Sequence, residues 1–198
     1  MLFRHYFNPA TQRPDTVLIL SKAGFSILEL MVTVALITLI TAIILVRYGA
    51  FNNVVLLKSQ AYEMALDIRE AQTNALSVRS TGTEYRQAFG VYFSQLTPNK
   101  YQLYLDSSGN GSYDTGEERD VPYLIDARFA VSDICINGCT VSVESLSVAF
   151  IRPDFDAHFY SNDYGGTITD AEITISSITD GGSSRAVIIN PVGQIEVQ

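Results

Sequence analysis

The chain has 198 residues, of which 47% are apolar and only 17% are charged, and its net charge is −8. This length favours one domain, or one domain with an appendage. The composition excludes a disordered acidic tail, a collagen-like fibre and a disulfide-dense mini-protein. Because nucleic-acid-binding proteins normally present a basic surface, direct contact with nucleic acid is not expected.

The charge is distributed unevenly along the chain. Residues 1–24 carry three basic side chains and one acidic side chain, which gives this segment a net charge of +2 and leaves −10 on residues 25–198. The most apolar stretch, residues 25–46, follows the basic segment and contains 22 residues with a single charge, Glu29, and no glycine or proline.

Residues 25–46 are predicted to form a transmembrane helix. A helix of this length spans about 33 Å, close to the thickness of a bilayer core. It also lacks the polar face that a core helix of a soluble domain usually has. The positive-inside rule places residues 1–24 in the cytoplasm and residues 47–198 outside, as in a single-pass protein of the inner (cytoplasmic) membrane. A cleaved secretory signal is not favoured, because no signal-peptidase site follows the apolar run.

Glu29 is the unusual residue of this segment. A carboxylate in an apolar run costs up to ~3 kcal/mol at the middle of a membrane and indicates a functional site. If the chain is cut between Gly24 and Phe25, a new α-ammonium group appears at Phe25. In an assembly, Glu29 of one subunit could neutralise this amine on a neighbouring subunit.

The segment Lys-Ala-Gly-Phe-Ser-Ile-Leu-Glu-Leu at residues 22–30 resembles the class III signal of type IV prepilins and type II secretion pseudopilins. In that family a basic leader ends in glycine, an aromatic residue follows, and glutamate is fifth in the mature chain. The resemblance implies cleavage after Gly24 by a prepilin peptidase, N-methylation of Phe25 and an assembly role for Glu29. This chain departs from the pattern in its 24-residue leader, longer than many, and in the absence of a proline from the membrane helix.

The same resemblance implies the partners of the chain and its final location. The partners would be other pilin or pseudopilin subunits, the prepilin peptidase and an inner-membrane assembly platform. After assembly, the subunit would belong to an extracytoplasmic filament.

An amphipathic helix is predicted for residues 47–79, in continuation of the membrane segment. Its apolar positions alternate at spacings of four and three, which is the pattern of one helix face. The expected partner of this face is the core of the domain, and a coiled-coil partner is the alternative. The positions are Leu57, Ala61, Met64, Ile68, Ala71, Ala75 and Val78.

From residue 80 onward the apolar period becomes two, which predicts an antiparallel β domain over residues 80–198. The fold class is therefore α+β, with a long N-terminal helix packed on an antiparallel sheet. The last two strands are expected to form a hairpin whose turn runs from Asn190 to Gly193. The expected strands cover residues 88–94, 101–105, 121–125, 146–152, 155–160, 173–176, 186–190 and 194–197.

The sequence of this last hairpin, residues 185–195, is similar to the end of the H-type pseudopilins and FimT-like minor pilins. The acidic, glycine-rich loop after residues 101–105 also resembles that branch. Together with the N-terminal signal, the resemblance implies a pilin-like fold.

Residues 106–117 have the spacing of a calcium loop, with oxygen-bearing side chains at positions 1, 3, 5, 7, 9 and 12 and Gly111 at position 6. The alternative is a solvated hairpin tip, which favours the same residue types for backbone reasons. The candidate ligands are Asp106, Ser108, Asn110, Ser112, Asp114 and Glu117.

Cys135 and Cys139 are the only cysteines of the chain. Outside the cytoplasm an even number of cysteines favours a disulfide, and the Asn137-Gly138 pair between them can turn the chain. A metal site would need two further ligands, and no second Cys/His cluster exists.

No catalytic motif is present, and the chain is not expected to be an enzyme. We consider two functions. The first is a structural pilin, minor pilin or pseudopilin subunit of a type IV pilus-like or type II secretion filament. The second is a single-span envelope protein that does not polymerise and has an outer β domain that could bind calcium. Glu29 and the Gly24-Phe25 junction favour the first, because a monomeric anchor gains nothing from a carboxylate in its membrane segment.

Overall fold

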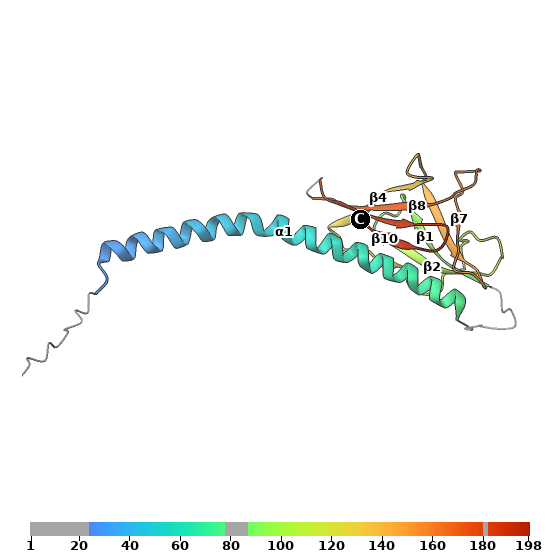
Figure 1. Ribbon diagram of the computed structural model, residues 1–198, viewed down its shortest axis with the longest axis horizontal. Coiled ribbons are helices and arrows are strands. Elements are labelled where there is room, and N and C mark those ends of the chain that lie inside the picture. Colours follow the sequence, from blue (N-terminus) through green and yellow to red (C-terminus); the bar gives the residue numbers. More distant parts are fainter. Residues whose placement is uncertain (1–23, 78–86, 180–181) are drawn as a thin grey trace, which may run out of the picture. The chain divides into compact units, whose positions relative to one another are not determined.

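The structure of the protein is a computed structural model, which describes residues 24–77, 87–179 and 182–198. The chain divides into two compact units, Met1–Leu45 and Val46–Gln198. The described residues form one helix and ten strands (Figure 1). These are α1 (Ile27–Leu76), β1 (Ala88–Ser94), β2 (Lys100–Asp106), β3 (Tyr123–Leu124), β4 (Phe129–Ile136), β5 (Val141–Ser142), β6 (Ser145–Phe150), β7 (Ala157–Tyr160), β8 (Ala171–Ser177), β9 (Ser184–Ile189) and β10 (Ile195–Val197).

The sequence explains where α1 begins and why it is so long. Ser26 occupies the N-cap position and Glu29 follows three residues later, which is the pattern of a capping box. The carbonyl of Ser26 accepts the first hydrogen bond, from the amide of Leu30 at 3.0 Å. The helix contains no proline and only one glycine over its 50 residues, so nothing in the sequence stops it before Leu76.

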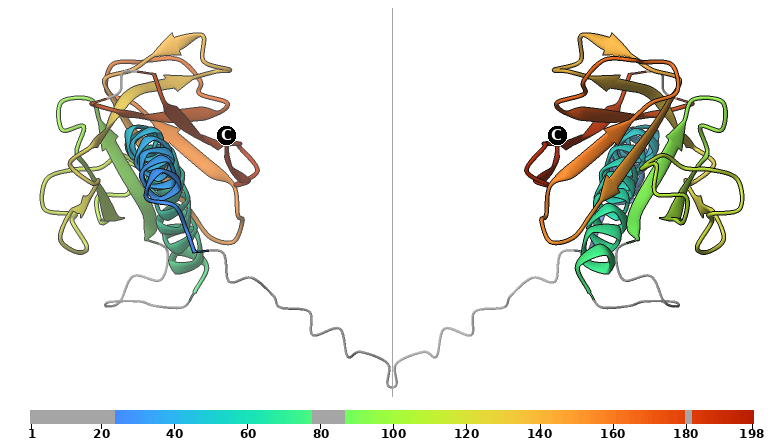
Figure 2. Two further views of the ribbon diagram at one scale, coloured as in Figure 1. Left: turned by 90° about the vertical axis from the view of Figure 1, so that its left-hand side faces the viewer. Right: turned by 90° about the vertical axis from the view of Figure 1, so that its right-hand side faces the viewer.

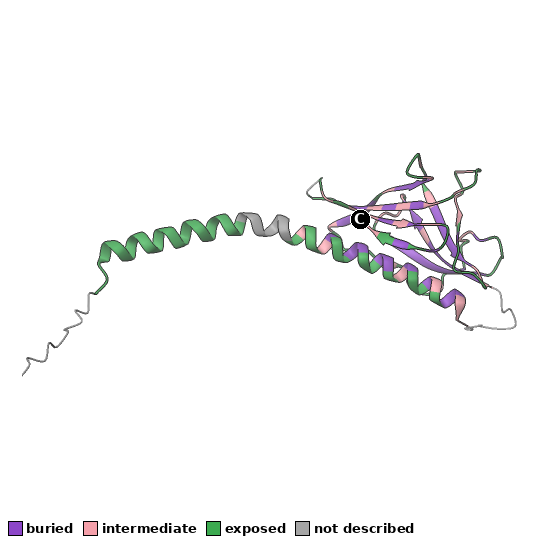
Figure 3. Cartoon of the chain, viewed as in Figure 1, coloured by how far each residue is buried: buried purple, intermediate pink, exposed green. Residues whose placement is uncertain are grey.

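The second half of α1 buries one face in the β domain, as the apolar period predicts. The side chains at the expected positions from 57 to 75 are at most 1% exposed, whereas Tyr62 and Leu66 on the opposite face are about half exposed. Figure 3 shows this alternation of buried and exposed residues along the second half of the helix. Val78 lies outside the described residues.

The β domain consists of two five-stranded antiparallel sheets and not of the single sheet expected. The strand order is β3-β2-β1-β6-β7 in the first sheet and β10-β9-β8-β4-β5 in the second. The chain moves between the sheets after β3, β5 and β7. The local period of apolar residues does not indicate to which sheet a strand belongs, so it could not predict these changes. The α+β class, with a long helix packed on antiparallel strands, is confirmed.

The core lies where the inner faces of both sheets meet the buried face of α1. Figure 2 shows strands of both sheets beside the second half of α1. In β1, residues Phe89, Val91 and Phe93 point into this core, as alternate positions of a strand must. In β8, Ile173 and Ile175 do the same from the second sheet.

Strand β4 was not expected, because a β-bulge interrupts its alternation. The register shifts between Val131 and Asp133. Before the shift, Phe129 and Val131 are buried, and after it the buried side chains are Ile134 and Ile136. An extra residue in a bulged strand moves all later side chains to the other parity, so the period of two is lost.

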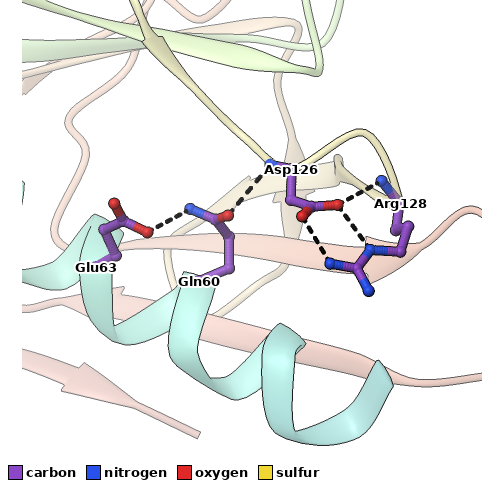
Figure 4. A network of polar contacts seen from close by, with 4 residues as sticks. All are labelled: Gln60, Glu63, Asp126 and Arg128. Carbon is purple, nitrogen blue, oxygen red and sulfur yellow. Dashed lines mark hydrogen bonds and ion pairs between the residues drawn. The ribbon is translucent and has the colours of Figure 1, made fainter. Parts of the chain in front are cut away.

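A polar network joins the chain just before β4 to the helix (Figure 4). The buried side chain of Gln60 accepts a hydrogen bond from the amide of Asp126 at 3.2 Å and donates one to Glu63 at 3.1 Å. Arg128 donates from Nε and Nη2 to the two carboxylate oxygens of Asp126, at 2.9 and 2.7 Å. These hydrogen bonds from Arg128 lower the pKa of Asp126. Through Gln60, the network links the segment before β4 to α1.

Candidate functional site

The residues of the expected cleavage and assembly site lie at the start of the described chain. Phe25 is 80% exposed. A Cβ atom added to Gly24 would have no atom within 4 Å of it. Glu29 lies in the first turn of α1, where the positive end of the helix dipole favours a carboxylate. The peptide bond between Gly24 and Phe25 thus lies in an exposed, non-helical segment directly before the helix.

The first half of α1 is apolar on all sides. Residues Ile27–Leu45 have a mean hydropathy of 2.6, and none of this span is buried within the structure. Its three threonines bond back to carbonyl oxygens of their own helix, as Thr33 does to Leu30 at 2.9 Å. Among the side chains of this span, Glu29 alone carries a charge. An apolar surface of this size needs lipid or protein to cover it.

Cys135 and Cys139 form a disulfide, as predicted, with their Cα atoms 4.7 Å apart. Cys135 is a buried residue of β4, and Cys139 lies in the exposed turn that leads to β5. The turn is tight because Asn137, Gly138 and Cys139 all have positive φ, at 56°, 67° and 57°. Asn and Gly tolerate this left-handed region best, which is the reason that Asn137-Gly138 can bring the cysteines together.

The candidate calcium loop, residues 106–117, is held together by its own amide groups. Asp106 accepts hydrogen bonds from the amides of Gly109 and Gly111 at 2.6 and 2.8 Å. Glu117 accepts from the amides of Ser107 and Ser108, both at 2.9 Å. Burial alone would raise the pKa of Glu117, but these hydrogen bonds lower it.

The remaining candidate ligands also face one another through hydrogen bonds. The side-chain Nδ2 of Asn110 donates to the carboxylate of Asp114 at 2.9 Å, and the hydroxyl of Ser108 donates to the carboxylate of Asp106 at 3.1 Å. The amide of Ser112 donates to Asn110 at 2.8 Å. Within residues 87–179, the three carboxylates of this loop do not gather their oxygens within 4.8 Å of one another. This arrangement is that of a hairpin tip capped by its side chains, and calcium binding stays a prediction.

The structure brings together one group that the sequence did not indicate. The carboxylate of Asp133 and the sulfurs of Cys135 and Cys139 lie within 4.8 Å of one another. Asp133 and Cys135 are two apart in β4 and therefore share one face of the strand. The spacing of two between Asp133 and Cys135 indicates a shared strand face, but only if residues 129–136 are known to form a strand.

A cleft of about 300 Å³ lies over the outer face of the first sheet. Tyr92 of β1 and Tyr113 of the loop after β2 form one wall, with ring centroids 4.6 Å apart. Lys100 and Glu118 also line the cleft, and the hydroxyl of Tyr113 donates to Glu118. Burial and this carboxylate raise the pKa of Tyr113 to about 12. The lining residues come from separate segments, and for that reason no local motif predicted the cleft.

No family model and no curated protein matches the sequence. Among solved structures, the chain is similar to the type IV minor pilin FimU of Pseudomonas aeruginosa strain PAO1. The two share 16% sequence identity, and the alignment covers 76% of this chain and 92% of that chain with a TM-score of 0.41. Because both values are low, conclusions about function depend on this chain's own residues.

Proposed function

We propose that this chain is a structural subunit of a type IV pilus-like or type II secretion filament, either a pilin or a minor pilin or pseudopilin. It is anchored in the inner membrane by residues 25–46 before assembly, with its N-terminus in the cytoplasm and its β domain outside. Its partners are then other subunits of the same kind, a prepilin peptidase and an inner-membrane assembly platform. No step of this function requires the chain to be an enzyme.

The observation that carries the proposal is the exposed apolar span Ile27–Leu45, with Glu29 as its single charge, directly after the Gly24-Phe25 junction. A lipid anchor needs only the apolar surface. The carboxylate is costly in lipid, and it becomes useful when a helix stack supplies a cation. Cleavage after Gly24 creates that cation at Phe25, four residues before Glu29 in the chain.

Pairing between subunits would set the register of the helix stack. A subunit that enters the stack brings one ammonium and one carboxylate into a core of low dielectric constant. Leaving one partner of a buried pair without the other costs about 3–5 kcal/mol. Misaligned subunits are therefore disfavoured, and the register in which Phe25 of one subunit meets Glu29 of the next is selected.

The test compares wild type with Glu29→Gln in cells that contain an active prepilin peptidase. Membrane insertion and cleavage should be unchanged, because neither needs the charge. The amount of protein in sheared filaments should fall at least about tenfold, which corresponds to only 1.4 kcal/mol of the expected cost. Glu144→Gln is the matched control, since Glu144 is an exposed carboxylate of the β domain.

Equal filament content for wild type and Glu29→Gln would contradict the register role. If wild type itself never leaves the membrane fraction, the non-polymerising envelope protein becomes the better description. A minor subunit can be too scarce to measure in filaments, and in that case assembly of the whole filament is the quantity to compare.

A further inference from the structure

We propose that the disulfide turn of the β domain is a redox-gated zinc site, formed by Asp133, Cys135 and Cys139 when the disulfide is reduced. In the oxidised protein the sulfurs are bonded to each other and leave no thiolate for a metal. A dithiol would open the site by thiol–disulfide exchange, in which it forms its own disulfide and transfers two electrons and two protons to Cys135 and Cys139. Zinc then displaces the two thiol protons.

The geometry supports three ligands. The carboxylate and the two sulfurs lie within 4.8 Å of one another. Zinc bond lengths of about 2.0–2.3 Å and tetrahedral angles require ligand atoms roughly 3–4 Å apart. Bonded sulfurs lie about 2 Å apart, so after reduction the two sulfurs must separate by about 1–2 Å, and the carboxylate must approach them by about 1 Å. A fourth position would be left for water, as in zinc sites with three protein ligands.

The carboxylate of Asp133 is already oriented by its neighbours. Its Oδ1 accepts hydrogen bonds from the hydroxyl of Ser142 at 2.5 Å and from the amide group of Gln95 at 3.2 Å. Ser142 is also the cross-strand partner of Cys135. No described residue donates to Oδ2, which leaves this oxygen free for a metal. Hydrogen bonds of this kind orient the ligands of natural metal sites.

The turn is held by contacts that do not involve sulfur. The side chain of Asn137 donates to the carbonyl of Thr167 at 3.2 Å and accepts from the amide of Thr169 at 2.8 Å. The amide of Gly138 donates to Asp170 at 2.8 Å. Pairing of β4 with β5 closes the hairpin. Because none of these contacts involves sulfur, we expect them to persist after reduction. The two thiols should then stay close together, and metal binding should cost little conformational entropy.

The ligand set selects zinc over the hard cations. Thiolates favour zinc and other soft or borderline metals, whereas calcium and magnesium prefer oxygen ligands only. The chain contains no cysteine besides these two. Any thiolate–metal signal from the protein must therefore come from this turn.

The experiment uses the full-length protein in detergent, reduced with a phosphine in oxygen-free buffer, because a dithiol would itself bind zinc. Zn²⁺ is titrated against a chromophoric chelator, and Co²⁺ is added separately to detect thiolate-to-metal charge-transfer absorption. The reduced protein should bind one Zn²⁺ and give the Co²⁺ absorption, and the oxidised protein should do neither.

Two substitutions test whether the carboxylate of Asp133 is a zinc ligand. Asp133→Asn should weaken Zn²⁺ binding by the reduced protein at least about tenfold, a typical loss when a metal site is perturbed. Asp154→Asn, which changes an exposed carboxylate elsewhere, should leave the affinity unchanged. The oxidised variants should melt as cooperatively as wild type, which shows that both are folded.

Three results would overturn the proposal. The first is a reduced protein that binds Zn²⁺ no better than the oxidised one. The second is binding without the Co²⁺ charge-transfer absorption. The third is equal affinity in wild type and Asp133→Asn, because the carboxylate would then not be a ligand.

Discussion

Asp67 and Tyr101 form a polar contact at the edge of the core. The hydroxyl of Tyr101 in β2 donates to the half-buried carboxylate of Asp67 on α1. Burial raises the pKa of Asp67, the hydrogen bond from Tyr101 opposes this rise, and the nearby Glu63 and Glu70 add to it. Burial and the same hydrogen bond also raise the pKa of Tyr101. The protonated form of Asp67 is therefore favoured by folding.

This contact predicts a pH dependence of stability. A raised pKa in the folded state contributes stability that is present below the ordinary value of 3.8 and is lost as the pH rises through the folded-state pKa. Asp67→Asn keeps an acceptor for Tyr101 but cannot ionise. The stability of Asp67→Asn relative to wild type should thus increase from about pH 4 upward and then level off.

Urea unfolding of full-length protein in detergent, followed by tyrosine fluorescence at several pH values, measures this difference. Asp154→Asn controls for the loss of an exposed carboxylate. A difference between Asp67→Asn and wild type that stays constant with pH would show that the carboxylate does not resist ionisation in the folded protein.

Gly193 in the turn between β9 and β10 has two constraints that can be separated. Its φ is +76°, and an added Cβ would lie 2.0 Å from the carbonyl oxygen of Phe155. Gly109 has nearly the same φ, +77°, with nothing near its Cβ position. Gly109→Ala should cost about 1 kcal/mol of unfolding free energy from backbone strain alone.

Gly193→Ala should cost more than Gly109→Ala, by about 1–3 kcal/mol, since the clash involves backbone that cannot rotate away. Urea unfolding of both variants without calcium gives the comparison. Equal losses would mean that the turn after β9 moves away from residue 155 at little cost.

At the scale of elements, α1 combines two surfaces that follow different rules. From Leu57 to Ala75 its buried face is set by the period of the apolar residues, and the small side chains of Ala61, Ala71 and Ala75 on this face are at most 1% exposed. From Ile27 to Leu45 no face is distinguished, and the whole surface requires an apolar environment. The β domain therefore covers one face of the second half of the helix, whereas the first half exposes its apolar side chains on all sides.

The loop at residues 106–117 is the element whose role an experiment has to decide. If it binds calcium, the melting temperature of the β domain should rise with Ca²⁺ concentration, because a ligand of the native state stabilises it. Asp106→Ala should abolish the rise. It should also lower the melting temperature without calcium, since the carboxylate of Asp106 accepts hydrogen bonds from the backbone amides of Gly109 and Gly111.

The rise in melting temperature on adding Ca²⁺ therefore tests calcium binding. A lower melting temperature of Asp106→Ala without calcium does not test it. Mg²⁺ at the same concentration controls for ionic strength. A wild-type melting temperature that does not change with Ca²⁺ would leave the loop as a hairpin tip stabilised by its own side chains.

At the scale of the molecule, the sequence divides into a basic segment, residues 1–24, and an acidic remainder of net charge −10. We predict that the mature protein begins at Phe25, because Gly24 and Phe25 precede the helix in an accessible segment. N-terminal mass analysis of protein extracted from envelopes measures this, and N-methylation of Phe25, which replaces an amine hydrogen by a methyl group, would raise the mass by one CH₂ unit. Gly24→Leu should leave the precursor uncleaved.

Ala23→Leu is the neighbouring control, which changes the leader without changing the residue before the cut. An intact Met1 in cells with an active prepilin peptidase would contradict the prediction. So would a mature chain that begins after residue 46.

Local patterns were enough for the features that depend on neighbours in the chain. The apolar period predicted the buried face of α1, because helical geometry alone decides which side chains share a face. Asn190 and Gly193 predicted the last hairpin, which the pairing of Ile195 with Ile189 confirms. The two cysteines were close enough in sequence to predict their disulfide.

The tertiary structure decided what depends on residues distant in sequence. The division of the strands into two sheets requires pairings such as β1 with β6, which no local period records. The bulge before Asp133 interrupts the alternation of β4, so the sequence pattern did not predict this strand. Only the folded strand places the carboxylate of Asp133 beside the cysteines. The sequence by itself therefore determined the helix and its apolar span, because these follow from composition and local geometry, and cleavage after Gly24 stays a prediction. The fold alone determined which side chains of separate segments meet, because that depends on the packing of the whole core.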